Sequence, residues 1–584
     1  MDDARLRTPY FLLTAHFLRE FLENDLISPE ADRSQLLAVV GSMIVSLTLF
    51  LSVVMSFGYV TTLTPGQAAV MSLDDKFLYL ALAMIVTALM ATTQWDALVI
   101  SPRDAAILEP LPLSAGTLRR AKMSAVAILG AAVAVAVNAC PSIVFPWLLV
   151  FNFREISFVA MLGLMVTHAS ITSAAAVFGY LVVIGLRETM TAVLGRRWFT
   201  RVSPWAQGAL IVTLGGALLL LPAAADRVVQ RGFEGWRALS PPMWFLGAYE
   251  VTIGGVIADL PRSSMTPRQA DADRISTTMY RERRGQFPGM AQRAGMAVGL
   301  SFLFATAAYM WNARRLPSLA PAPPVFRRHW GLSARLASAF LLRNSAARAG
   351  FCFCLAAMWR SNTHRLTLAC AAAAGFAMAV LALSNANVVE GGGASARLLS
   401  MQPLLYGALL VGFRHVIRVP AELRANWGFQ LAWRNRDRAF LAGAKYAAVA
   451  ALVLPALIVL FPLFLFVLGP RLALIHAALG LAGAIVLLEA LMISYDKVPF
   501  TCTYLPSENM KALAPIYAIA FVVGASMFAQ MQHEFLEGAG STRTLLTLAV
   551  VFAIVRVLSV KRARLPYVEF DEAPATFQRL GLDG

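Results

Sequence analysis

Charged residues are scarce in this sequence. They make up 14% of its 584 residues, whereas hydrophobic residues make up 58%, and the mean hydropathy is +0.65. A soluble domain carries about a quarter charged residues, so the composition excludes an ordinary soluble protein. It predicts an all-α polytopic membrane protein, because a helix satisfies its own backbone hydrogen bonds inside a bilayer.

Cysteine is also rare, and none of the five cysteines forms a Cys-x-x-Cys pair. We therefore infer neither a disulfide framework nor a zinc site. The sequence has no Gly-x-x-x-x-Gly-Lys-Ser/Thr loop, so this chain does not hold ATP phosphates by that motif. It also lacks His-Glu-x-x-His and Gly-x-Ser-x-Gly. Any ATP-driven step would therefore need another polypeptide.

Apolar segments long enough to cross a membrane recur along the whole chain. Spanning takes about 20 residues of helix, and twelve segments come close to that length or exceed it. They cover residues 36–60, 77–95, 123–150, 158–186, 205–221, 291–311, 366–383, 398–416, 446–468, 472–493, 512–531 and 544–560.

Lys and Arg gather in every second loop between these segments. Since basic residues favour the cytoplasmic side of a membrane, both termini are predicted to be cytoplasmic. The net charge of +17 is then explained by membrane orientation, and we predict no nucleic-acid partner. The long loop at 222–290 falls on the outer side. Its residues 239–251 are apolar but too few to cross the membrane, so they predict a re-entrant or interfacial piece. Residues 259–286 are polar and charged and predict an exposed stretch.

An order of elements occurs twice in the chain. An amphipathic segment (9–28, then 346–365) precedes two spans, a basic turn (100–122, then 418–445) and an Ala-Lys that leads into a third span. This predicts two pseudo-repeated six-helix halves, each with an interfacial helix before it. The predicted parts are an N-terminal interfacial helix at 1–34, a first transmembrane half at 35–311, a cytoplasmic connector with the second interfacial helix at 312–365, a second transmembrane half at 366–560 and a cytoplasmic tail at 561–584.

Few ionisable residues fall inside the predicted spans, and buried charge is costly enough that each is a functional candidate. His168 lies in the middle of the fourth span, and Glu489 lies near the end of the tenth. His168 is either a neutral histidine bonded to a neighbouring helix or part of a translocation path. Glu489 is a second candidate for that path. The scarcity argues against a proton-coupled carrier, whose relay needs carboxylates in the bundle.

The acidic pair Asp74-Asp75, just before the second apolar segment, permits two interpretations. Such a pair could hold a metal and a lipid-linked donor in a membrane-embedded glycosyltransferase. It could equally mark the start of a helix, where acidic side chains interact favourably with the helix dipole.

Four stretches resemble a known family. The first basic turn, DAAILEPLPLSAGTLRRAK at 104–122, is similar to the first cytoplasmic turn of ABC-2-type exporter permeases of bacteria. Residues 241–250, 420–427 and 499–506 resemble stretches of large permeases of this kind. The resemblance implies a permease subunit in the bacterial inner membrane that carries no cofactor. Its partner would be a separate cytoplasmic ATP-binding subunit, a dimer, which holds the ATP and Mg.

The resemblance also assigns residues that would dock the ATPase. They are Arg103, Asp104, Leu108 and Glu109 in the first basic turn and Glu422, Arg424, Asn426 and Trp427 in the second. Family members typically have six spans and pair up, whereas this chain contains both halves. An ion-coupled or facilitative carrier that needs no ATPase, and the glycosyltransferase above, are the alternatives. The apolar spans slightly favour a lipid-like or amphipathic cargo.

Overall fold

The computed structural model divides the chain into two units, Met1–Val325 (unit 1) and Phe326–Gly584 (unit 2). The division falls within the predicted connector at 312–365. The residues that the structure describes are 9–22, 45–46, 48–54, 56–60, 63–95, 97–98, 107–108, 110–111, 113–153, 156–225, 238–253, 256–258, 265–315, 344–384, 389–390, 393–421, 423–432, 437–493, 495–502, 508–538, 541–561 and 568–570.

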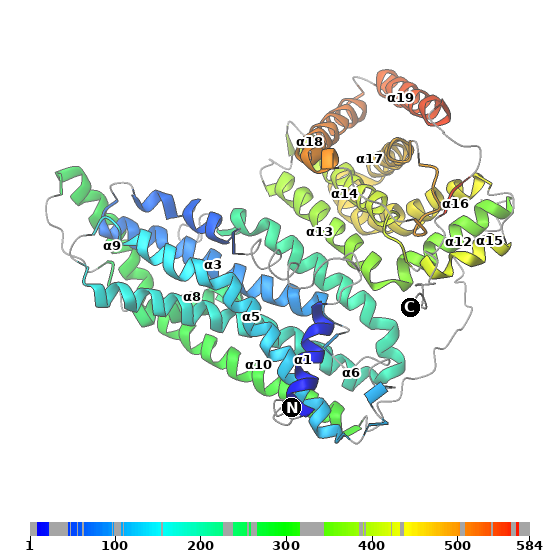
Figure 1. Cartoon of the computed structure of the whole chain (residues 1–584). Coiled ribbons are helices and arrows are strands. Elements are labelled where there is room, and N and C mark those ends of the chain that lie inside the picture. The colour runs from blue at the N-terminus through cyan, green and yellow to red at the C-terminus, as the bar shows by residue number, and fades with distance from the viewer. Residues whose placement is uncertain are drawn as a thin grey trace, which may run out of the picture. The chain divides into compact units, whose positions relative to one another are not determined.

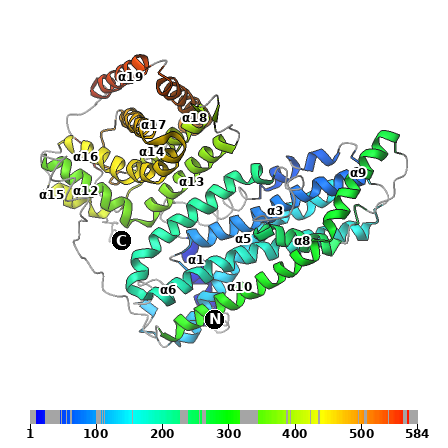
Figure 2. The ribbon, with the colours of Figure 1, turned by 180° about the vertical axis from the view of Figure 1, so that it is seen from behind.

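Unit 1 is an elongated helical bundle (Figures 1 and 2). Helices α3, α5, α6 and α10 form its length. Helix α8 packs on α3, α6 and α10, and α9 packs on α3. Its elements are α1 (Pro9–Leu22), η2 (Phe57–Val60), α3 (Pro65–Thr93), α5 (Ala115–Leu149), α6 (Phe158–Ala225), α8 (Pro241–Ile253), α9 (Pro267–Arg284) and α10 (Phe287–Arg315).

Unit 2 is built around α14, which packs against α13, α17 and α18. Two strands of two residues each pair antiparallel between α13 and α14. The elements are α12 (Ser345–Arg360), α13 (Asn362–Ser384), β1 (Val389–Glu390), β2 (Gly393–Ala394), α14 (Ala396–Val416), η4 (Leu423–Asn426), α15 (Trp427–Ala432), α16 (Ala439–Ala448), the π-helical η5 (Val449–Val453), α17 (Leu454–Leu491), α18 (Glu508–Leu536) and α19 (Ser541–Lys561).

Nine helices in the described part of the chain are long and apolar enough to cross a membrane. This composition agrees with a helical multi-pass membrane protein, but the count of twelve spans and the repeat of two halves stay predictions. The first predicted span lies partly outside the described residues, and its residues Thr48–Tyr59 form a shorter apolar helix. Helix α18 covers the predicted span at 512–531 but is not among the nine.

Two of the long helices bend at a glycine. The backbone of Gly469 has φ of 75° inside α17, between the two segments predicted as spans nine and ten. Gly195 has φ of 65° inside α6, between predicted spans four and five. Both glycines have non-helical backbone angles, so each ends one helix and lets the next one start in a new direction. A positive φ is accessible to glycine at little cost.

Two helices of the predicted outer loop pack on the long helices of unit 1. Residues expected to form a re-entrant or interfacial piece form α8, which packs on α3, α6 and α10. Residues expected to be exposed form α9, which begins with a capping box between Thr266 and Gln269. Helix α9 buries Asp273, Thr277 and Tyr280. The exposure predicted for this stretch is confirmed for most residues of α9 and is wrong only for this face. Asp273 accepts from the backbone N–H of Gly66 on α3, and Tyr280 donates to Glu250 on α8.

Candidate functional site

The first basic turn is described only in part. Arg103, Asp104 and Glu109 lie outside the described residues, and Leu108 is half-buried beside the core that α1, α3, α5 and α6 share. Within the turn, α5 begins after Ser114, whose hydroxyl accepts a hydrogen bond from the backbone N–H of Thr117 at 3.1 Å. Ser114 thus caps the start of α5, as serine does at many helix N-termini.

The first part of the second basic turn belongs to a folded support that we call the platform. The platform comprises residues 417–421, 423–432, 495–502 and 568–570. The backbone N–H of Phe500 donates to the carbonyl of Ile417 at 2.9 Å, and the N–H of Ala421 donates to the carbonyl of Phe500 at 2.9 Å. The N–H of Val498 donates to the carbonyl of Glu569 at 2.7 Å. The segment predicted as a cytoplasmic tail therefore contributes to the platform.

A short helical segment of the platform, η4 and α15, carries three of the four predicted docking residues of the second half. Glu422 lies outside the described residues, and Arg424 is placed only by its backbone, in η4. The side chain of Asn426 is buried and donates to the carbonyl of Thr501 at 2.8 Å. Trp427 is 62% exposed and Leu431 is 74% exposed. These two side chains are four positions apart, which places them on the same face of the helix.

Phe429 anchors the opposite side of α15. Its ring lies 5.3 Å from that of Phe353 on α12 and 5.6 Å from that of Phe570 in the C-terminal part of the platform. Aromatic pairs at such distances are favourable beyond the area they bury. Because these ring contacts fix one side of α15, the exposed face that carries Trp427 and Leu431 has a fixed position.

His168 is fully buried in unit 1, on α6, among aromatic rings. Its Nδ1 lies 3.2 Å from the hydroxyl of Tyr249 on α8, a hydrogen-bond distance. The ring centroids of Tyr79 and Phe145 lie 5.3 and 5.2 Å from its own. Contact with a neighbouring helix was one of the two interpretations of His168; its role in a translocation path stays a prediction.

A buried ion pair that the sequence analysis missed lies beside His168. Lys76 Nζ on α3 lies 2.6 Å from Glu250 Oε1 on α8, and each side chain is 1% exposed. The hydroxyl of Tyr280 on α9 donates to Glu250 Oε2 at 2.6 Å, and Lys76 Nζ lies 4.9 Å from the ring centroid of Tyr249. The ring and the carboxylate both stabilise the ammonium. The available signal was a lysine directly before an apolar run.

The acidic pair Asp74-Asp75 lies next to this lysine in α3. The hydroxyl of Tyr59 donates to Asp75 Oδ2 at 2.5 Å. This bond joins α3 to η2, which precedes it. Within the described ranges, no group of three or more His, Cys, Asp and Glu side chains is arranged to hold a metal ion.

Glu489, the other candidate for a translocation path, is also paired. Its Oε2 lies 2.7 Å from Lys445 Nζ and 3.7 Å from a guanidinium nitrogen of Arg556. Lys445 is the lysine that ends the second basic turn. Its counterpart in the first half, Lys122, lies 4.6 Å from the ring centroid of Phe17 on α1. The two lysines thus occupy similar places in the sequence but have different partners.

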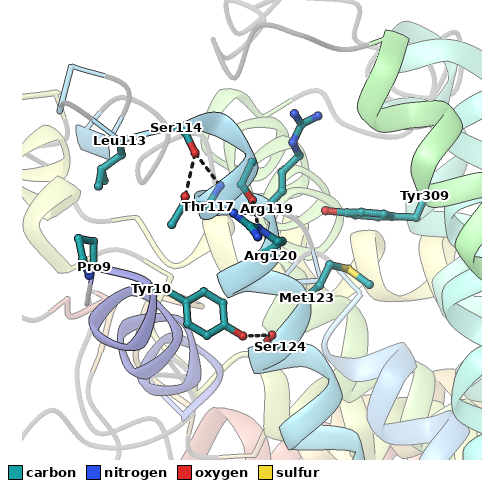
Figure 3. A pocket seen from close by; sticks show the side chains of 11 residues that line it. Pro9, Tyr10, Leu113, Ser114, Thr117, Arg119, Arg120, Met123, Ser124 and Tyr309 are labelled. Carbon is teal, nitrogen blue, oxygen red and sulfur yellow. Dashed lines mark hydrogen bonds between the residues drawn. The ribbon is translucent and has the colours of Figure 1, made fainter. Parts of the chain in front are cut away.

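A pocket of about 1000 Å³ is lined by residues of α1, α5 and α10 and includes the C-terminal part of the first basic turn (Figure 3). Arg119 and Arg120 lie along its α5 wall, Tyr10 comes from α1 and Tyr309 from α10. The hydroxyls of Tyr10 and Ser124 are 2.6 Å apart and join α1 to α5. Both charged side chains in the described lining of this pocket are arginines.

No family model matches this chain, and no curated protein or solved structure matches it either.

Proposed function

We propose that this chain is the transmembrane permease subunit of an ATP-binding-cassette exporter, driven by a separate cytoplasmic ATPase. The observation that carries the proposal is the exposed face of η4 and α15. A tryptophan and a leucine project from a short helix whose other side is fixed by Asn426 and Phe429. Exposed aromatic and aliphatic anchors on a rigid support are typical of surfaces that bind a protein partner.

The rest of the chain is consistent with this role. Nine helices of the described ranges are long and apolar enough to form a membrane-embedded body, and the sequence lacks the phosphate-binding loop that an ATPase would need. Helices α1 and α12 have the amphipathic character of interfacial helices ahead of each half. Under the proposal, ATP-dependent closure of the partner moves the two halves and changes which side of the membrane the cargo path faces.

Purification of the intact chain from its own membranes tests the proposal. The chain carries an affinity tag, the detergent is mild, and mass spectrometry quantifies the proteins that remain bound. We expect a stoichiometric protein with a phosphate-binding loop, whose ATPase activity changes when it binds the purified chain in lipid nanodiscs. Consistent absence of such a protein would contradict the proposal.

The buried pair of Lys76 and Glu250 favours a second candidate, an ion-coupled carrier. The sequence analysis argued against such a carrier because carboxylates in the bundle are scarce, yet Glu250 is buried between α3 and α9 and bonded to a lysine and a tyrosine. Buried ionisable networks of this kind occur in proton relays. A carrier would accumulate an amphipathic fluorescent dye in proteoliposomes under an ion gradient without nucleotide. Lack of gradient-driven uptake would exclude it for that dye.

A further inference from the structure

The pocket between α1, α5 and α10 is basic. Both charged side chains in its described lining are arginines, Arg119 and Arg120, on the first turns of α5. The hydroxyls of Ser114 and Thr117, 2.8 Å apart, lie on the same wall. Guanidinium groups match the geometry of phosphate oxygens and form strong charge-assisted hydrogen bonds with them. The polar wall is therefore suited to a phosphate group.

The remaining lining is apolar or aromatic. Pro9, Leu113 and Met123 contribute aliphatic surface, and the rings of Tyr10 and Tyr309 close two sides (Figure 3). A fully soluble anion has no group that would gain from contact with this surface. A phospholipid does, because its glycerol and first methylenes follow the phosphate and gain free energy when apolar area is buried.

The pocket also lies at the end of two candidate spans. One of them begins at Gly116 and the other ends at Asn312, so that end corresponds to a membrane surface. Helix α1 beside the pocket buries Phe17 against α5 but leaves Phe11 and Leu12 exposed. An amphipathic helix with exposed apolar residues next to basic side chains is typical of a segment that lies in the membrane interface. Tyrosine is enriched at the same depth.

From this geometry we infer that the pocket binds the phosphate-bearing head group of an anionic phospholipid, with Arg119 and Arg120 as the phosphate ligands. Tyr10 and Tyr309 then flank the glycerol. The lipid joins α1 to α5 and α10 and holds the interfacial helix against the bundle. This inference goes beyond the proposed function and does not depend on an ATPase partner.

Native mass spectrometry of the delipidated full-length protein tests the inference. The protein is titrated with phosphatidylglycerol or with phosphatidylcholine of the same acyl chains. We expect tighter binding of phosphatidylglycerol. Arg119→Gln with Arg120→Gln is expected to weaken that binding by at least about tenfold, because the loss of even one charge-assisted hydrogen bond has that effect. If the double variant does not fold, each single variant is measured, with a smaller loss expected.

The matched control removes the same charge elsewhere. Arg348 and Arg360 are exposed arginines of α12, the other predicted interfacial helix. Replacing both by glutamine is expected to leave the affinity for phosphatidylglycerol unchanged. Equal loss in the control, or no loss in the pocket variant, would overturn the inference.

Two further arms separate the sources of the anion. Inorganic phosphate at the same concentration is expected not to displace phosphatidylglycerol; full displacement would overturn the assignment to lipid and reassign the pocket to soluble phosphate. A pocket variant that binds phosphatidylglycerol normally but no longer retains a protein with a phosphate-binding loop would overturn the inference as well, because the pocket would then be a protein docking surface.

Discussion

Lys76 and Glu250 form an ion pair across 174 positions of sequence, with 2.6 Å between Nζ and Oε1 and 1% of each side chain exposed. The pair joins α3, at the position directly before the predicted second span, to α8 in the predicted outer loop. Since isolated buried charges are costly, the carboxylate and the ammonium each depend on the other.

We expect Lys76→Met or Glu250→Gln alone to destabilise unit 1 by about 3–5 kcal/mol, because each leaves a buried group without its counter-charge. The double variant is expected to lose much less than the sum of the two, since the pair is removed together. Thermal unfolding of the protein in detergent, followed by near-UV circular dichroism, measures the three variants. Strictly additive losses would show that the two charges are not coupled.

Trp427→Ala is expected to weaken association with the proposed ATPase by at least about tenfold, because exposed tryptophans contribute disproportionately to protein interfaces. The binding of the purified partner to the chain in nanodiscs measures the effect. Trp147→Ala is the control, since Trp147 is also exposed but lies on α5 within a candidate span. Equal binding of the Trp427 variant and the native chain would remove the main support for the docking surface.

Gly443→Ala is expected to destabilise unit 2 by about 1–3 kcal/mol, as overpacking does. A methyl group at Gly443 on α16 would overlap the carbonyl oxygen of Ala347, and one at Gly350 on α12 would overlap that of Phe440. These glycines let α12 and α16 approach backbone to backbone. The melting temperature checks the prediction, and Gly428→Ala is the control because its methyl group meets nothing within 4 Å. An unchanged melting temperature for the Gly443 variant would contradict the close packing.

Cys354, on α12, is expected to resist maleimide while the protein is folded. Burial raises the pKa of its thiol well above the ordinary value, because desolvation disfavours the thiolate, which is the reactive form. The contribution of this thiol to stability is complete at neutral pH and declines above about pH 8.5, where the unfolded chain loses the proton first. Peptide mass spectrometry after labelling measures the reaction, with half-buried Cys352 as the faster comparison. Labelling of Cys354 at the rate of Cys352 would contradict the burial.

Much of the candidate site could not be predicted from the sequence. The sequence analysis selected His168 and Glu489 because they lie inside apolar segments, and both are paired with side chains on other helices. It passed over Lys76 and Glu250 because each lies at an end of an apolar segment, where a charge is ordinary. Only the packing of α8 and α9 on α3 buries the side chains of Lys76 and Glu250 inside unit 1. The docking residues of the first turn stay a prediction, since three of the four lie outside the described part of the chain.

The sequence by itself determined the helical class, the apolar composition of the spanning helices and the amphipathic segments at α1 and α12. Hydropathy and helix periodicity are local properties that can be read along the chain. Tertiary structure alone decided that Glu250 meets Lys76, that residues 495–502 and 568–570 support the second basic turn, and that α1, α5 and α10 enclose a basic pocket. These contacts join segments far apart in sequence, and their free energy depends on which faces of the helices meet.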